Sequence, residues 1–513
     1  MRTISLLAGI LLLTISSAFA TNVDIGTPGG AGGVAVSGTW TTGNTYIIHD
    51  HMVIAVGSSL TIQPGVNVLI ADTSLKIEMI CLGNFYSLGT QASPVTISVE
   101  PNLIPGTVTT TNPFPGLWGG IICDTTCSEF LMLYTSIKYY RAATTNTSPS
   151  VLLGLYKDAA GETEPYTDFR DHNGGKLVIE HCTFSNGMDD GVYIEGGNVI
   201  YAYNTLYQNG STGGDAVDIK AGTIADCAYN FFYSPNTNAF KLSNTGSRSP
   251  QANIFVYNNT IVNTGWRRPT VKGGGIWYEA GVIGQSYNNL LINPRFGIKT
   301  NGAADSASKA DYNYYFGNWQ NVVTNFTTAT GLFPNGTHDI LSDSAGDKNP
   351  LVKNYPLSTD TMNSTYDPSW DFHLLAGSPA IGKGTTNFNR HFGTTATGIT
   401  ILGVTYVSPN PSDTIGAFGV YSTAGIETVN NDETLKIYPN PVKSELTLQF
   451  NATSEQSVLK IYSIMGQVVM SEDIHNANGF NTLSIPVNSL SNGCYFVTIQ
   501  NGNSVIREKF IKE

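Results

Sequence analysis

Short runs that alternate apolar and polar positions recur through the middle of the chain. Five of them share one layout, in which a small residue precedes an apolar, a variable and a further strand-forming residue. They are Gly191-Val192-Tyr193-Ile194, Ala216-Val217-Asp218-Ile219, Ala239-Phe240-Lys241-Leu242, Gly275-Ile276-Trp277-Tyr278 and Gly297-Ile298-Lys299-Thr300. This alternation is typical of a short strand with one face on an apolar core and the other outside it. It predicts five aligned strands whose variable position faces outward.

Two further lines of residues repeat at similar intervals. An asparagine followed by apolar residues recurs, and its positions are Asn204, Asn230, Asn259, Asn289 and Asn313. An apolar run opens each unit, and by eye these runs begin at Val178, Val199, Ile224, Ile254 and Ile283. Units with two or three short strands and few hairpin signals favour the coils of a parallel β-helix, where stacked neighbours share one core. We expect the asparagines to form a structural hydrogen-bonded ladder along the axis.

The flanks of the repeats carry a family resemblance. Residues 43–48, 59–66 and 116–122 resemble the opening coils of secreted bacterial right-handed β-helix proteins, and residues 349–352, 371–381 and 413–418 resemble their closing part. The resemblance covers about residues 40–420. It implies an all-β chain built mainly as a right-handed parallel β-helix, and it implies no particular activity.

The last eighty residues differ from the repeats. After a polar stretch at 422–433, which we interpret as a linker, alternating runs near residues 435–438, 445–450, 458–462, 483–485 and 495–499 predict a small antiparallel β-sandwich. The segments Tyr438-Pro439-Asn440-Pro441-Val442, Leu490-Ser491-Asn492-Gly493 and Lys509-Phe510-Ile511-Lys512 resemble the type A sorting domain of type IX secretion cargo. This resemblance implies handling by the type IX machinery, followed by release or attachment at the cell surface. A fibronectin-like accessory module is the alternative.

The first twenty residues have the layout of a secretory signal peptide, with Arg2, an apolar run over residues 4–15, and small residues ending at Ala20. We therefore expect a signal peptide at 1–20, the β-helix at 21–421, the linker at 422–433 and the sorting domain at 434–513. No later stretch reaches the apolar length of a membrane-spanning helix. The net charge of −12, with no basic stripe, argues against nucleic acid as a partner.

The outward positions of the aligned strands suggest where a ligand could bind. They form one row of Tyr193, Asp218, Lys241, Trp277 and Lys299 and a second row that includes Glu195, Lys220, Ser243 and Glu279; Trp266, Arg267 and Arg268 fall in the longest turn. Aromatic rings pack on sugar rings, carboxylates bond hydroxyl groups, and basic side chains neutralise uronates. The mixture suits a polysaccharide groove. Charges that pair between coils on an ordinary solvated face are the alternative.

Cleavage of such a polymer would need particular groups. A lyase needs a base, for which Lys220 or Lys241 is a candidate, and a cation such as Arg267 or Arg268 to stabilise the enolate. A hydrolase needs two carboxylates at a suitable distance, and the candidates on neighbouring coils are Asp189, Asp190, Asp215 and Asp218. The motifs of pectate lyases and polygalacturonases are missing. The competing hypothesis is therefore a non-catalytic surface adhesin or structural stalk.

Metal and disulfide chemistry add little to these hypotheses. No metal site is predicted, although the oxygens of Asp189, Asp190 and Asp215 are of the kind that calcium binds, and no loop has the spacing of a calcium motif. The six cysteines are scattered, and only Cys123 and Cys127 are near enough in sequence for a local disulfide. Buried thiols are the alternative, and a zinc site lacks a second Cys or His pair.

Overall fold

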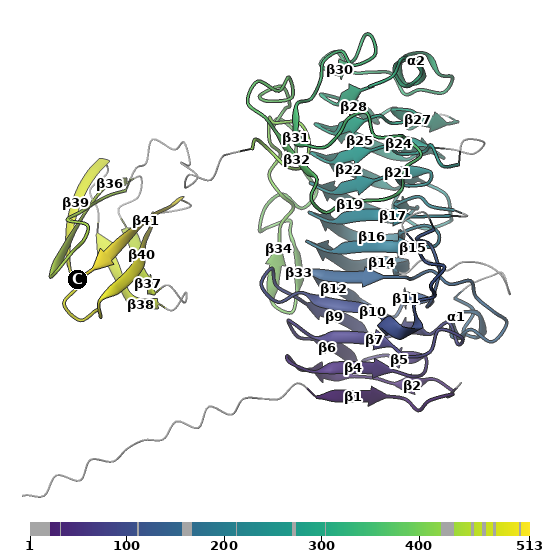
Figure 1. Ribbon diagram of the computed structural model, residues 1–513, viewed down its shortest axis with the longest axis horizontal. Coiled ribbons are helices and arrows are strands. Elements are labelled where there is room, and N and C mark those ends of the chain that lie inside the picture. The colour runs from purple at the N-terminus through teal and green to yellow at the C-terminus, as the bar shows by residue number, and fades with distance from the viewer. Residues whose placement is uncertain are drawn as a thin grey trace, which may run out of the picture. The chain divides into compact units, whose positions relative to one another are not determined.

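The alternating segments form strands that stack into a parallel solenoid. A computed structural model describes residues 21–421, apart from 31, 110–111, 156–166, 212, 269–272 and 303, and residues 435–513, apart from 453–455, 464–467, 476–478 and 502–503. The predicted signal peptide and linker lie outside the described residues. The chain divides after Tyr421 into two compact units, and the solenoid of about eleven turns occupies residues 22–341 of the first (Figure 1).

Three columns of parallel strands make the walls of the solenoid. The column that contains the predicted row from Tyr193 to Lys299 is called here the site column. It consists of β2 (Val34–Ala35), β5 (Met52–Ile54), β8 (Glu78–Cys81), β11 (Gly120–Cys123), β14 (Thr167–Glu180), β16 (Val192–Ala202), β18 (Val217–Ile219), β21 (Asn238–Ser243), β24 (Gly274–Glu279) and β27 (Ile298–Asn301). The long strands β14 and β16 also run through the second column.

The second and third columns complete each coil. The second contains β3 (Gly38–Trp40), β6 (Ser59–Ile62), β9 (Asn84–Leu88), β12 (Glu129–Leu133), β19 (Thr223–Ala228), β22 (Asn253–Tyr257), β25 (Ile283–Tyr287) and β28 (Lys309–Asp311). The third contains β1 (Asn22–Ile25), β4 (Thr45–Ile48), β7 (Asn67–Ile70), β10 (Val95–Val99), β13 (Thr135–Lys138), β15 (Thr183–Gly187), β17 (Thr205–Asn209), β20 (Phe231–Tyr233), β23 (Thr260–Val262), β26 (Leu290–Ile292), β29 (Tyr314–Phe316) and β30 (Ile340–Leu341). Apolar side chains from all three columns fill one continuous core.

The predicted asparagine ladder is present in full. The Nδ2 of Asn230 donates to the Oδ1 of Asn259 at 3.0 Å, and the same bond joins each ladder asparagine to the next, from Asn204 to Asn313. All five residues are buried. The backbone N–H of Asn313 donates to Asp339, which ends the ladder. The ladder thus satisfies the polar groups of one turn on every coil that it crosses.

The apolar runs that open each unit pair in a different register from the one expected. Val178 pairs with Ile200, and the line continues through Asp226, Phe255 and Gln285. The residues that align with Val178 therefore lie one or two positions after the expected ones, which were Val199, Ile224, Ile254 and Ile283. The strands were expected in the right places, but their register was wrong.

The helix α2 (Gln320–Thr328) buries Val322, Val323 and Phe326 against the last coils. The chain then returns along the outside of the solenoid through β31 (Val352–Asn354), β32 (Asp371–Leu374) and the hairpin of β33 (Ile399–Ile401) and β34 (Val404–Tyr406), as Figure 1 shows in green. Asp226 of β19 accepts hydrogen bonds from the backbone of His391 and Phe392 and from the Ser408 hydroxyl. The return segment is thereby tied to coils formed much earlier in the sequence.

Two short helical turns, η1 (Pro101–Leu103) and α1 (Pro149–Leu152), lie in loops between strands. All six cysteines are unpaired thiols, and five of them, including Cys123 and Cys127, are buried. Of the two alternatives for that pair, the structure has the buried thiols.

The second unit has its own core between two antiparallel sheets, as the sequence predicted. One sheet contains β35 (Lys436–Tyr438), β36 (Glu445–Ala452) and β39 (Gly479–Pro486). The other contains β37 (Gln456–Ser463), β38 (Val468–His475), β40 (Gly493–Asn501) and β41 (Ser504–Lys512).

Candidate functional site

The site column places the predicted row in register. Tyr193, Asp218, Lys241, Trp277 and Lys299 are successive Cα partners on β16, β18, β21, β24 and β27. Their neighbours along each strand, such as Val217 and Ile219 on either side of Asp218, belong to the apolar core. The side chains of the row therefore lie on the outer face of the column. Two members of the second row, Ser243 and Glu279, are likewise Cα partners on β21 and β24.

The row is far less exposed than the sequence suggested. Asp218 is fully buried, Lys220 and Glu279 are 6 % exposed, and Trp277 is 7 % exposed. The pairing of charges between coils, one of the two alternatives, is present between Asp218 and Lys241, but the positions named above are buried rather than solvated. Residues 156–166, which precede β14, and residues 269–272, which end one residue before β24, lie outside the described part of the chain.

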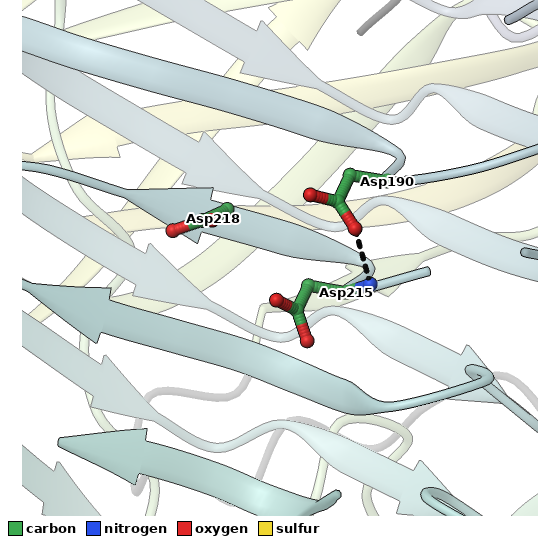
Figure 2. Close-up of side chains that lie close together, drawn as sticks. All are labelled: Asp190, Asp215 and Asp218. Atoms are coloured by element: carbon green, nitrogen blue, oxygen red, sulfur yellow. Dashed lines mark hydrogen bonds between the residues drawn. The ribbon is translucent and has the colours of Figure 1, made fainter. Parts of the chain in front are cut away.

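Three aspartates meet where β16 and β18 of the site column begin. Asp190 precedes β16, Asp215 precedes β18, and Asp218 lies within β18; each offers an oxygen within 4.8 Å of the others (Figure 2). The Oδ1 of Asp190 accepts hydrogen bonds from the backbone N–H of Gly214, at 2.9 Å, and of Asp215, at 2.7 Å. These bonds fix the turn of one coil to the turn of the next. The three residues are called here the carboxylate cluster.

Asp215 is held by groups that the sequence did not single out. Its Oδ1 accepts hydrogen bonds from the Thr237 hydroxyl and from the backbone and side-chain amides of Asn238, the last at 2.7 Å. Burial, together with the charges of Asp190 and Asp218, raises its pKa to about 7, although Lys241 and Thr237 act in the opposite direction. Asp215 thus retains its proton for much of the time near neutral pH.

Asp218 is the counter-ion of two lysines. Its Oδ2 lies 3.0 Å from the Nζ of Lys220 and 2.9 Å from the Nζ of Lys241, while its buried Oδ1 has no hydrogen-bond partner among the described residues. Burial raises the pKa of Asp218 despite both lysines. Burial acts to lower the pKa of Lys241, but the charges of Asp218, Asp215 and Glu279 outweigh it, so the pKa of Lys241 is raised.

Lys241 also supplies the positive charge that the cluster needs. Its Nζ lies 3.8 Å from Asp215 and 3.8 Å from Glu279, in addition to its bond with Asp218. Three carboxylates are the ligand type that calcium prefers, but calcium takes six to eight oxygens at about 2.3–2.6 Å. A protonated amine already occupies part of that environment, so the residues present fit an internal ion pair better than a calcium site.

Asp189 stands apart from the cluster. Its Oδ2 lies 3.8 Å from the guanidinium of Arg141, and its Oδ1 accepts the backbone N–H of Asp190. Arg141 is only 3 % exposed and was missed by the sequence analysis. Hydrogen bonding within its own turn is the ordinary role of an aspartate there, and Asp189 makes such a bond in addition to its contact with Arg141.

The remaining predicted residues extend the row without joining the cluster. The Nζ of Lys220 lies 5.2 Å from the ring centroid of Tyr193, and Glu195 lies 3.4 Å from the guanidinium of Arg248. The Nε1 of Trp277 donates to Glu279 at 3.2 Å. The row therefore consists of linked ion pairs and cation–π contacts.

Trp266, Arg267 and Arg268, the predicted residues of the long turn, form different hydrogen bonds. Arg267 donates to the carbonyl oxygens of Asn209, Gly210 and Ser234, so its guanidinium is fixed within the fold. Trp266 is similarly fixed, because its Nε1 donates to the carbonyl of Asn293. Arg268 is half-buried and contributes its carbonyl oxygen to Arg295.

The raised pKa of Asp215 predicts that stability falls as pH rises. The folded state holds a proton up to about pH 7, whereas the ordinary value is 3.8. Between these values the folded state binds more protons than the unfolded state, so this group should lower the free energy of unfolding by about 2 kcal/mol from pH 5 to pH 7. Urea unfolding at a series of pH values measures the change. Asp215→Asn should remove it and the exposed Asp413→Asn should keep it; equal profiles for all three proteins would contradict the prediction.

Comparisons with known proteins bear on the second unit. Residues 436–513 match the model of the secretion system C-terminal sorting domain. No curated protein and no solved structure matches the chain. Within the described residues, no helix is long and apolar enough to cross a membrane. With its sorting tail and its stacked parallel coils, the chain is a type IX secretion cargo with a β-helix fold, destined for the cell surface or for release.

Proposed function

We propose that the β-helix binds an extracellular polysaccharide along the row from Tyr193 to Lys299 and cleaves it at the carboxylate cluster. The observation that carries the proposal is the pairing of Asp215, whose pKa is raised to about 7, with Asp190 on the neighbouring coil. Glycoside hydrolysis needs one carboxylic acid that donates a proton and one carboxylate that acts as base or nucleophile. Asp215 suits the first role and Asp190 the second.

The geometry favours hydrolysis over elimination. A lyase would use Lys220 or Lys241 as the base, but both amines are bonded to Asp218, and the raised pKa of Lys241 keeps it protonated. Of the two candidate cations for the enolate, Arg267 has its guanidinium taken up by backbone carbonyls, which leaves only Arg268. The spacing within the cluster is nearer the roughly 5 Å of retaining glycosidases than the wider separation of inverting ones.

A second candidate function has its own support. The charges of the row pair with one another, and Trp277 is 7 % exposed with its indole N–H bonded to Glu279. Such a network also serves a rigid, non-catalytic adhesin or stalk, in which buried ion pairs fix the register of the coils.

Incubation of the purified chain with a panel of neutral, uronate-containing and sulfated polysaccharides separates the two functions. Hydrolysis is expected to release new reducing ends without the ultraviolet absorbance of unsaturated uronates. That absorbance would instead indicate a lyase and refute the acid assignment of Asp215. Retention of a glycan without any cleavage would favour the adhesin, and neither binding nor cleavage of any member would refute the proposal.

A further inference from the structure

Most basic side chains around the row are bound within the chain. Lys220 and Lys241 pair with Asp218, Arg248 pairs with Glu195, and Arg267 is held by backbone carbonyls. Lys299, the last member of the row, has no carboxylate partner among the residues that the structure describes. Lys299 is half-buried, so its side chain is partly removed from water.

The surroundings of Lys299 are aromatic and basic. Its Nζ lies 4.0 Å from the ring centroid of Phe296 and 5.9 Å from that of Trp277. The guanidinium of Arg295 lies 4.7 Å from the same Phe296 ring, and its Nη1 donates to the carbonyl of Arg268 at 3.4 Å. Two cations therefore share one aromatic ring. Burial lowers the pKa of Lys299, and the charge of Arg295 lowers it further.

The charge of Arg295 disfavours the protonated form of Lys299, and an anion that contacts Lys299 would offset this repulsion. Carboxylate and sulfate groups form charge-assisted hydrogen bonds with guanidinium and ammonium donors, and an adjacent aromatic ring can pack on the apolar face of a sugar. At the carboxylate cluster, by contrast, Lys220 and Lys241 are already paired with carboxylates of the chain.

We propose that Lys299, Arg295 and Phe296 form an anion-binding subsite, which receives the carboxylate or sulfate group of an acidic polysaccharide. This inference rests on the proposed function, because it names the substrate class for the same row. Lys299 lies three strand steps from Asp218 in the register, roughly 14 Å at the spacing of neighbouring strands. An extended polymer along the row would place one of its anionic groups at Lys299.

Binding of the full chain to three soluble probes tests the subsite: polygalacturonate, which carries carboxylates, dextran sulfate, which carries sulfates, and neutral dextran. Lys299→Met keeps the length of the side chain and removes its charge. It should weaken binding of the anionic probes about tenfold, which corresponds to one ion pair of about 1.4 kcal/mol, and leave dextran unchanged. The probe that loses most affinity shows whether carboxylate or sulfate is the natural group.

The matched control is Lys309→Met, which removes an exposed lysine on β28. It should bind all three probes as the unaltered chain does. Because Lys299→Met relieves repulsion, its midpoint of thermal unfolding should be equal or higher, and Arg295→Gln should give the same loss of anion binding. Equal binding of dextran and the anionic probes, or equal effects of Lys299→Met and Lys309→Met, would refute the subsite and leave the proposed function standing. Failure to bind any glycan would refute the proposed function itself.

Discussion

Asp215→Asn is expected to reduce polysaccharide cleavage about a thousandfold, the middle of the range that a general acid contributes. The amide keeps an oxygen in the place of Oδ1, so it can still accept the hydrogen bonds of Thr237 and Asn238. It also resembles the protonated form of Asp215, which the raised pKa favours near neutral pH. The fold should therefore survive while the transferable proton is lost. Release of reducing ends from the best substrate of the panel measures the effect.

Two comparisons make this result specific. Asp413→Asn removes an exposed carboxylate of the same chain and should leave the rate unchanged. Asp190→Asn should lower the rate to a similar extent, because the reaction needs both carboxyl groups. If Asp215→Asn kept full activity, the proton donor would have to be another residue, and the assignment of the cluster would fall.

Asn259→Ala is expected to lower the free energy of unfolding by about 4 kcal/mol. Its Oδ1 accepts from the backbone and side chain of Asn230, and its Nδ2 donates to Asn289 and to the carbonyl of Cys227. All of these groups are buried, and each one left without a partner costs about 1–3 kcal/mol. Equilibrium denaturation in urea at constant pH measures the loss.

Asn301→Ala is the matched control, because Asn301 is exposed at the end of β27. It should change stability by less than about 0.5 kcal/mol. A small effect at Asn259 would mean that water replaces the ladder bonds, and the ladder would then be a consequence of the fold rather than a support for it.

The sequence predicted the row and the ladder because each depends on a local rule. A strand that alternates core and outer positions shows its register directly, as in the line from Tyr193 to Lys299. A buried asparagine at every turn is equally conspicuous. The opening strands of each unit were aligned incorrectly for a physical reason. Val199 is buried in the core, but Ile200 is also buried, on the opposite face, beneath the returning hairpin. With apolar residues on both faces, alternation no longer identifies the register.

The candidate site could be predicted only in part. The sequence placed Asp190, Asp215 and Asp218 on neighbouring coils, and the structure brings them together. It gave no sign that Asp218 and Trp277 of the row are buried, because burial depends on which side chains of adjacent coils reach each other. Asn238 was missed although it directly precedes an aligned strand, and nothing local marks Arg141, whose partner Asp189 lies on another coil.

The return segment has a consequence for how the β-helix is completed. Asn258 donates its side-chain amide to the carbonyls of Ser412 and Thr414, and Asp226 receives its donors from residues 391–408. A chain that stopped after Leu341 would leave the Asp226 carboxylate and the apolar outer patch around Ile200 without their cover. We expect such a truncated chain to aggregate rather than to form a shorter rod. Residues 342–421 thus cover part of the outer surface of the coils, and we expect the coils to reach their final packing only after these residues have been synthesised.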